Sequence, residues 1–173
     1  MNKIGLFYGP MGGSVENVAK KLLKLLGEDK VDLRPIRDAS AADVNKYHKV
    51  IFGISTIGSH TWQRETPSKD WDSFIHELDH IDYSNKVIAL YGLGDHITYA
   101  LHFVDSLGVL GELLMEKGAH IIGQTSTDDY DYKESDAVID GKFIGLPLDE
   151  DYESDKTDER IKNWLDKILP LFE

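Results

Sequence analysis

Two stretches of the sequence carry residue types whose spacing could do chemistry. The first places Gly9, Gly12, Gly13 and the hydroxyl of Ser14 between an apolar run and an amphipathic repeat. Glycines let backbone N–H groups approach a ligand closely, and a helix N-terminus attracts negative charge, so this stretch can hold an anion without a cationic side chain. A sharp strand-to-helix turn would need the same glycines without a ligand, and this stretch alone leaves both interpretations open.

The second stretch, His76-Glu77-x-x-His80, satisfies the H-E-x-x-H pattern. On an α-helix this spacing places two imidazoles on one face for zinc and leaves Glu77 as a general base. His80, however, falls where the helix is expected to end, and the pattern suggests no third ligand nearby. A solvated helix end is therefore favoured over a zinc hydrolase, and no metal ligand is assigned.

Composition limits the class of protein. The 173 residues fit one domain, residues 1–173, and 41% of them are apolar, enough for a substantial core. A net charge of −12 disfavours nucleic acid as a partner and favours a basic protein. Without cysteine the chain has no disulfide, catalytic thiol or iron–sulfur cluster. We expect a cytoplasmic, soluble protein, because neither a leader peptide nor an apolar run of membrane-spanning length is evident, and we expect it to be a monomer.

The elements that must position these stretches alternate between strand and helix. Apolar runs predict strands at Ile4 to Phe7, Val31 to Ile36, Lys49 to Ser55 and Lys86 to Tyr91, with a last strand at Ala119 to Gly123 that resumes at Lys142 to Leu148. Three- and four-residue spacing predicts helices at Val15 to Leu26, Trp71 to Leu78, Thr98 to Lys117 and Thr157 to Phe172. This order predicts an α/β fold: a five-stranded parallel sheet with helices on both faces, its last strand interrupted by an insertion.

Ligands of such sheets bind beyond the carboxyl ends of the strands. Three loops leave those ends, at Gly9 to Ser14, Thr56 to Lys69 and Gly92 to Tyr99. We therefore expect any ligand site to be built from these loops.

Two segments resemble the long-chain flavodoxins. Tyr91 to Glu112, YGLGDHITYALHFVDSLGVLGE, is similar to the isoalloxazine loop and following helix of that family, and Gly141 to Leu165 is similar to its last strand and final helix. The resemblance covers essentially the whole chain, including the interrupted strand. It implies a flavodoxin-like fold, non-covalently bound FMN and low-potential transfer of single electrons between proteins, and hence a carrier rather than an enzyme.

The resemblance also implies which residues bind FMN. They are Gly9, Pro10, Met11, Gly12, Gly13, Ser14 and Val15 around the phosphate; Thr56, Ile57, Gly58 and Trp62 after the third strand; and Gly92, Leu93, Gly94, Asp95, Tyr99 and His102 near the ring. Tyr99 matches the stacking tyrosine of the family, and either Ile57 or Trp62 is expected to cover the other face of the flavin.

The phosphate loop departs from the family pattern, Thr/Ser-x-Thr-Gly-x-Thr. Pro10, Gly12 and Val15 stand at the three hydroxyl positions, so Ser14 supplies the remaining hydroxyl. Phosphate binding is then expected to depend on backbone N–H groups of Met11 to Val15. The same departure leaves open an alternative, a binding module of this fold that has lost FMN.

The expected partners are redox proteins, a basic flavodoxin reductase or oxidoreductase in particular. The chain has 31 acidic and 19 basic residues, and the acidic runs Asp128 to Asp131 and Asp149 to Asp155 are expected on the surface. A field of that sign would steer a basic partner toward the flavin. Neither nucleic acid nor a membrane is an expected partner.

Overall fold

A computed structural model describes residues 3–55 and 69–173 of the chain. Its main sheet is parallel, with the strand order β2-β1-β3-β4-β5, and β9 also pairs with β4. The strands are β1 (Ile4–Gly9), β2 (Val31–Pro35), β3 (Lys49–Ile54), β4 (Val87–Leu93), β5 (His120–Ile122) and β9 (Leu146–Leu148). The predicted α/β fold with a parallel sheet is confirmed.

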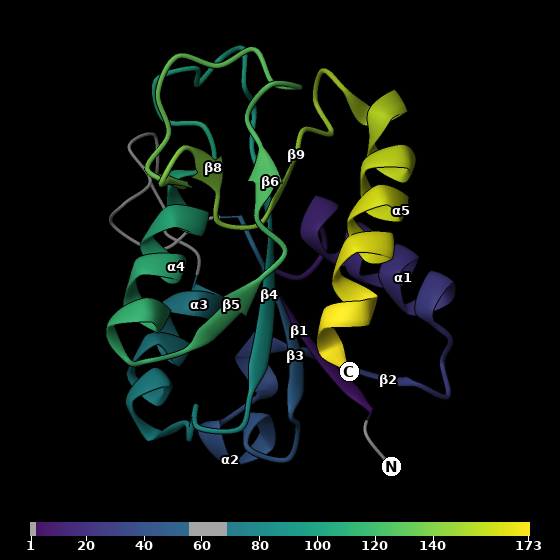
Figure 1. The fold of residues 1–173 in the computed structure, drawn as a ribbon, viewed down its shortest axis with the longest axis vertical. Helices are drawn as coiled ribbons and strands as arrows, with labels where there is room; N and C mark the ends of the chain where they lie inside the picture. Colours follow the sequence, from purple (N-terminus) through teal and green to yellow (C-terminus); the bar gives the residue numbers. More distant parts are fainter. Residues whose placement is uncertain (1–2, 56–68) are drawn as a thin grey trace.

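Helices cover both faces of this sheet (Figure 1). α1 (Ser14–Leu26) and α5 (Thr157–Ile168) lie on one face, and α3 (Lys69–Phe74) and α4 (Asp105–Glu116) lie on the other. Shorter elements are α2 (Ala41–Val44) and the 3₁₀ helices η1 (Ile36–Asp38), η3 (Ile75–His80), η4 (Ser154–Lys156) and η5 (Leu169–Phe172). Over residues 3–55 and 69–173, we find no helix with the length and apolar character needed to cross a bilayer.

The sheet separates two hydrophobic clusters, because its central strands are apolar on both sides. Leu22 of α1 and Trp164 of α5 belong to one cluster, and Phe52 of β3 packs with Trp71 of α3 in the other. Both buried indoles donate to backbone carbonyls: Trp71 to Gly53 at 3.0 Å, and Trp164 to the loop after β5 at 2.9 Å. The buried polar atoms of these aromatic anchors are therefore satisfied.

The interruption of the last strand forms a small sheet of its own. β6 (Thr125–Ser126), β8 (Lys142–Phe143) and β7 (Val138–Ile139) pair antiparallel in the order β6-β8-β7. The prediction that one strand resumes over Lys142 to Leu148 was wrong in this detail, since β8 pairs within the small sheet and only β9 pairs with β4. Phe143 explains the division, because it is fully buried against Tyr130 and Tyr132 of the insertion.

The helix predicted from Thr98 begins seven residues later, at Asp105. Residues 96–104 instead form turns. The Asp95 carboxylate accepts the N–H groups of Ile97 at 3.0 Å and Thr98 at 2.7 Å, and the Asp95 carbonyl accepts the Tyr99 amide at 3.2 Å, so a capped turn forms here without continuing into α4. Val104 then adopts a left-handed conformation with φ of 49°, and α4 begins after it.

Candidate functional site

A cavity of about 310 Å³ lies where the loops after β1, β4 and β9 meet. It is lined by Pro10, Gly13, Ser14, Val15, Ser55, Leu93, Gly94, Asp95, Tyr99, His102, Val104, Asp105, Ser106, Glu150 and Asp151. Its volume is typical of a small-molecule site, and its position at the carboxyl edge of a parallel sheet is the one expected for this architecture.

The structure brings together most of the residues predicted around the phosphate and the ring. Nine of them line the cavity: Pro10, Gly13, Ser14, Val15, Leu93, Gly94, Asp95, Tyr99 and His102. Gly9 and Gly92 lie behind the cavity wall and are closely packed. A Cβ added to Gly9 would lie 2.6 Å from the Ile36 side chain, and a Cβ added to Gly92 would lie 3.0 Å from the Leu107 side chain. Thr56, Ile57, Gly58 and Trp62 lie outside the described residues.

The phosphate loop is built from backbone rather than from side chains. Gly12 has a φ of 83°, and Gly13 precedes α1 with no side-chain capping bond. The first hydrogen bond of α1 runs from the Asn17 amide to the Gly13 carbonyl at 3.1 Å, so the amides of Gly13, Ser14 and Val15 precede the first intrahelical donor. These amides and the Ser14 hydroxyl lie at the cavity wall, where a helix start can offer donors to an anion.

Two carboxylates accept hydrogen bonds from the amides of Met11 and Gly12, which precede these three in the loop. The Met11 amide donates to Asp70 at 3.1 Å, and the Gly12 amide bonds to Glu16. The Tyr8 hydroxyl also donates to Glu16 at 3.0 Å, and together with Lys20 it lowers the pKa of the Glu16 carboxyl. The amides of Met11 and Gly12 are therefore already paired with carboxylates, and phosphate binding by the amides of Met11 to Val15 stays a prediction.

A tyrosine of the central strand fixes where α1 begins. The Tyr91 hydroxyl on β4 donates to the Val15 carbonyl at 2.9 Å. Its ring crosses β3 at Gly53, where a Cβ would lie 2.1 Å from the ring, so only glycine fits at that position. Burial raises the pKa of the Tyr91 hydroxyl, which therefore remains a donor.

The segment between β4 and α4, which forms the cavity wall around Tyr99, is held by hydrogen bonds to the insertion between β5 and β9. Amides of Lys133 and Glu134 both donate to the Ala100 carbonyl at 2.8 Å. Asp105, at the start of α4, accepts the Asp136 amide at 2.8 Å and contacts the His102 imidazole at 3.0 Å. The insertion thus supports from outside the segment that carries Tyr99 and His102.

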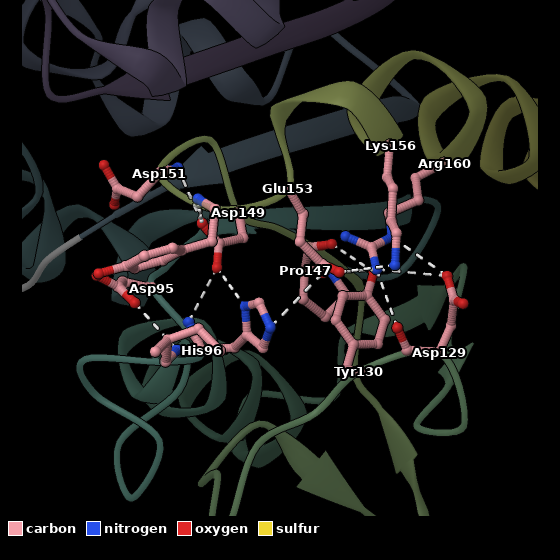
Figure 2. A network of polar contacts seen from close by, with 12 residues as sticks. Asp95, His96, Asp129, Tyr130, Pro147, Asp149, Asp151, Glu153, Lys156 and Arg160 are labelled. Atoms are coloured by element: carbon pink, nitrogen blue, oxygen red, sulfur yellow. Dashed lines mark hydrogen bonds and ion pairs between the residues drawn. The ribbon is translucent and has the colours of Figure 1, made fainter.

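Sequence reasoning missed two buried residues at this end, His96 and Asp149. Asp149 is fully buried, so the prediction that the whole run Asp149 to Asp155 lies on the surface was wrong. Its carboxylate accepts the amides of His96, Asp151 and Tyr152 at 3.1, 2.9 and 2.9 Å and contacts the His96 ring (Figure 2). The available signal was its place directly after a buried strand, at the edge where ligands bind.

The carboxyl groups of this wall have opposing pKa shifts. Burial acts to raise the pKa of Asp149, but hydrogen bonds from Tyr152, His96 and Asp151 outweigh burial and lower it. The pKa of the neighbouring Asp151 is raised, first by burial and then by the negative charges of Asp95, Asp149 and Glu150. Asp149, whose pKa is lowered, therefore lies behind the cavity wall, and Asp151, whose pKa is raised, lines it.

The H-E-x-x-H stretch gains no support from the structure. Residues 75–80 form the 3₁₀ helix η3, in which residues three apart, not four, share a face. Glu77 accepts the Ala41 amide at 3.3 Å, a structural bond to α2. In the part of the chain that the structure describes, His, Asp and Glu side chains form no group of three or more suited to a metal ion.

Comparisons with known proteins agree with this architecture. The family model described as Flavodoxin matches residues 6–164. The flavodoxin of Nostoc sp. is 42% identical over 170 residues, 98% of this chain and 97% of that protein. Flavodoxin 1 of Azotobacter vinelandii is 43% identical over 169 residues, 95% of this chain and 94% of that protein.

The fold of this chain is also similar to that of a solved structure. The Fusobacterium nucleatum flavodoxin bound to flavin mononucleotide has a TM-score of 0.88 and 27% identity, and the match covers 100% of both chains. Since the family model spans most of the chain and relatives above 40% identity span nearly all of it, this chain belongs to the flavodoxin family.

Proposed function

We propose that FMN binds in the cavity between the loops after β1, β4 and β9. One observation carries this assignment: the same cavity is lined at one end by the start of α1 and at the other by Gly94, Asp95 and Tyr99. The protein is an FMN-dependent electron carrier, and like other flavodoxins it transfers electrons between redox proteins rather than acting as an enzyme.

The residues present fit this cofactor. The amides of Gly13, Ser14 and Val15 and the Ser14 hydroxyl offer donors to a phosphate group at one end. At the other end Tyr99 offers a ring for stacking, and Leu93 and Val104 offer apolar surface. The FMN supplies the redox chemistry when bound, and the chain supplies the environment that sets its potential.

Charge around the ring end favours a low potential. Asp95, Glu150 and Asp151 all line the cavity, and the surrounding chain carries a net charge of −12. An added electron is disfavoured by nearby negative charge, so this wall should lower the potential of the electron-rich flavin. Burial raises the pKa of Asp151, and the negative charges of Asp95, Asp149 and Glu150 raise it further.

The first test is the visible absorbance of the purified protein, followed by titration of the apoprotein with FMN. We expect flavin bands and a dissociation constant that rises in Ser14→Ala, because a hydrogen bond to a charged group contributes about 1.5–3 kcal/mol. The exposed Ser84→Ala, far from the cavity walls, is the control. A colourless protein whose apo form takes up no FMN would instead favour the alternative, a binding module that has lost its cofactor.

We also propose that the redox partner is a basic protein, such as a flavodoxin reductase or oxidoreductase. The excess of acidic residues supports charge-steered encounter, which raises association rates by about 10–10³ at low salt. Stopped-flow electron transfer should slow steeply as salt approaches 1 M, where the Debye length is about 3 Å. A rate indifferent to salt would leave the charge a role in solubility only. The single domain, the monomeric state and the cytoplasmic location stay predictions.

A further inference from the structure

The two carboxylate oxygens of Asp149 accept hydrogen bonds from two different loops at the cavity. Oδ2 accepts the His96 amide at 3.1 Å and contacts Nδ1 of the same residue, in the loop after β4. Oδ1 accepts the amides of Asp151 and Tyr152, both at 2.9 Å, in the loop after β9. One buried carboxylate therefore joins two loops that lie 53 residues apart in the sequence.

The His96 imidazole completes this junction. Its side chain is 4% exposed and lies between two carboxylates, with Nδ1 on Asp149 and Nε2 3.9 Å from Glu153 (Figure 2). The ring also packs edge-on against Phe103, with 6.0 Å between the ring centroids. A buried polar ring with this packing has little freedom to turn.

The junction extends to α5 and to the insertion. Glu153 accepts from Arg160 of α5 at 3.0 Å and from Lys156 at 2.7 Å. Arg160 in turn donates to the Asp129 carbonyl at 3.0 Å and lies 4.2 Å above the Tyr130 ring. Figure 2 shows these side chains as one continuous network from the cavity wall to the insertion.

We propose that His96 and Asp149 form a positioning pair, which holds the loops at 94–99 and 149–152 in the arrangement that binds the flavin ring. The proposal rests on the FMN site proposed above. Neither member of the pair lines the cavity, whereas their neighbours Asp95, Glu150 and Asp151 do, so the pair acts on the cofactor through the loops it joins.

The physical reason is pre-organisation. Without the junction, two loops would have to be ordered when the ring binds, and that conformational entropy would be subtracted from the affinity. The junction also fixes the distance between the ring and the carboxylates of Asp95 and Asp151, and a potential depends on that distance. Loss of the pair should therefore change affinity and potential together, which a residue that only stabilises the fold would not do.

The test compares His96→Leu and His96→Gln with the matched control His120→Gln. His120 is exposed at the amino end of β5, away from the cavity. Three quantities are measured: amide hydrogen exchange at residues 96–98 and 151–152 of the apoprotein, the FMN dissociation constant, and the flavin reduction potentials. Exchange in the apoprotein reports on the loops without any bound cofactor.

For His96→Leu we expect faster exchange at both loops, an FMN dissociation constant raised by about tenfold, the equivalent of ~1.4 kcal/mol, and a shifted potential. His96→Gln should recover part of each effect, because an amide group can still donate to Asp149. The control should change none of the three. Should His96→Leu fail to fold, His96→Gln and Asp149→Asn, which weaken the same contact more mildly, decide the question.

Two results would overturn the proposal. The first is a lower free energy of unfolding with affinity and potentials unchanged, which would make the pair purely structural. The second is faster exchange in the loop after β4 alone, because a junction must release both loops. Failure of the FMN site itself has a different signature, since Tyr99→Ala and Ser14→Ala would then also leave the dissociation constant unchanged.

Discussion

The two ends of the cavity are built in opposite ways. At the end proposed to bind phosphate, the available donors are the amides of Gly13 to Val15 at the start of α1 and the Ser14 hydroxyl. At the ring end side chains tie together segments far apart in the sequence, as Asp149 does for the loops after β4 and β9. The donors at one end are backbone amides, in a loop that Tyr91 and Asp70 also contact, whereas the loops of the other end are joined to each other by side chains.

This difference determines how each end responds to mutation. Backbone amides survive most substitutions, so the phosphate end can lose the hydroxyls of its family pattern and keep its donors. The ring end has no such tolerance, because removing one member leaves buried partners unsatisfied. Changes at the phosphate end should therefore alter affinity alone, whereas changes at the ring end should alter both affinity and stability.

The largest effect is expected from Asp149→Ala. Removal of a buried carboxylate that accepts three amides and an imidazole should lower the free energy of unfolding by about 3–5 kcal/mol. Denaturant unfolding of the apoprotein measures this loss. The matched control is Asp166→Ala on the exposed side of α5, with an expected change within about 0.5 kcal/mol. Equal losses in the two variants would mean that the ring end is no more interdependent than the surface.

The next effect is expected from Val15→Thr at the phosphate end. Val15 lines the cavity, although it is 1% exposed and belongs to the cluster between α1 and the sheet, so Val15→Thr tests whether a hydroxyl at this position reaches the proposed phosphate. We expect FMN to bind about tenfold more tightly, from the lower end of the 1.5–3 kcal/mol for a hydrogen bond to a charged group. Isothermal titration of the apoprotein measures the change.

The control for that substitution is Val18→Thr, one turn further along α1. Val18 is buried in the same cluster as Val15 but does not line the cavity, so a hydroxyl there has the same cost in stability without access to the proposed phosphate. Gly12→Thr is unsuitable for restoring the family pattern, because Gly12 has a φ of 83°. If Val15→Thr and Val18→Thr bind FMN equally well, the phosphate lies elsewhere.

A smaller effect is expected from Tyr99→Ala. Aromatic stacking contributes about 0.5–1.5 kcal/mol beyond burial, so FMN should bind roughly 2–10-fold more weakly. Loss of the ring should also raise the potential of the second one-electron reduction, because stacking disfavours the electron-rich flavin. Tyr99→Phe, which keeps the ring, is the matched variant. Unchanged potentials in Tyr99→Ala would assign that face of the flavin to another side chain.

The smallest effect is expected in the pH dependence of stability. The pKa of Asp149 is lowered in the folded protein, so its stabilising contribution is present above the unfolded pKa of about 3.9 and is lost as pH falls through the folded value. Unfolding free energies between about pH 5 and pH 3 should fall less steeply for Asp149→Asn than for the unchanged protein. Parallel curves would show that this carboxylate titrates alike in both states.

Much of the fold and the ring end could be predicted from sequence. Continuous apolar strands and amphipathic helices gave the alternating order, and the long match over Tyr91 to Glu112 placed Asp95 and Tyr99 beside one cavity. The predicted start of α4 was wrong by seven residues, because the helical spacing of apolar residues continues through a segment of turns that the left-handed Val104 separates from the helix.

Tertiary contacts explain what the sequence could not show. An acidic run is usually solvated, and nothing local marks Asp149 as the member that turns inward, since its partners come from a loop 53 residues away. The Asp70 carboxylate likewise reaches the Met11 amide only through folding, from 59 residues away. Such residues are recognised by the element they follow rather than by their neighbours in sequence.

The division of the sheet edge between β5 and β9 has a consequence for the order of folding. Both strands pair with β4, β5 along Val87 to Ala89 and β9 along Tyr91 to Leu93. Closing the second pairing requires the insertion to be looped out first, which is entropically slower than forming the nearer contact. The carboxyl half of β4, where the cavity lies, should then gain its last neighbour late, which pulsed hydrogen exchange at Leu148 and Ile122 during refolding would detect as later protection of Leu148. A cofactor that binds at this half of β4 would therefore bind only after β9 has paired, late in folding.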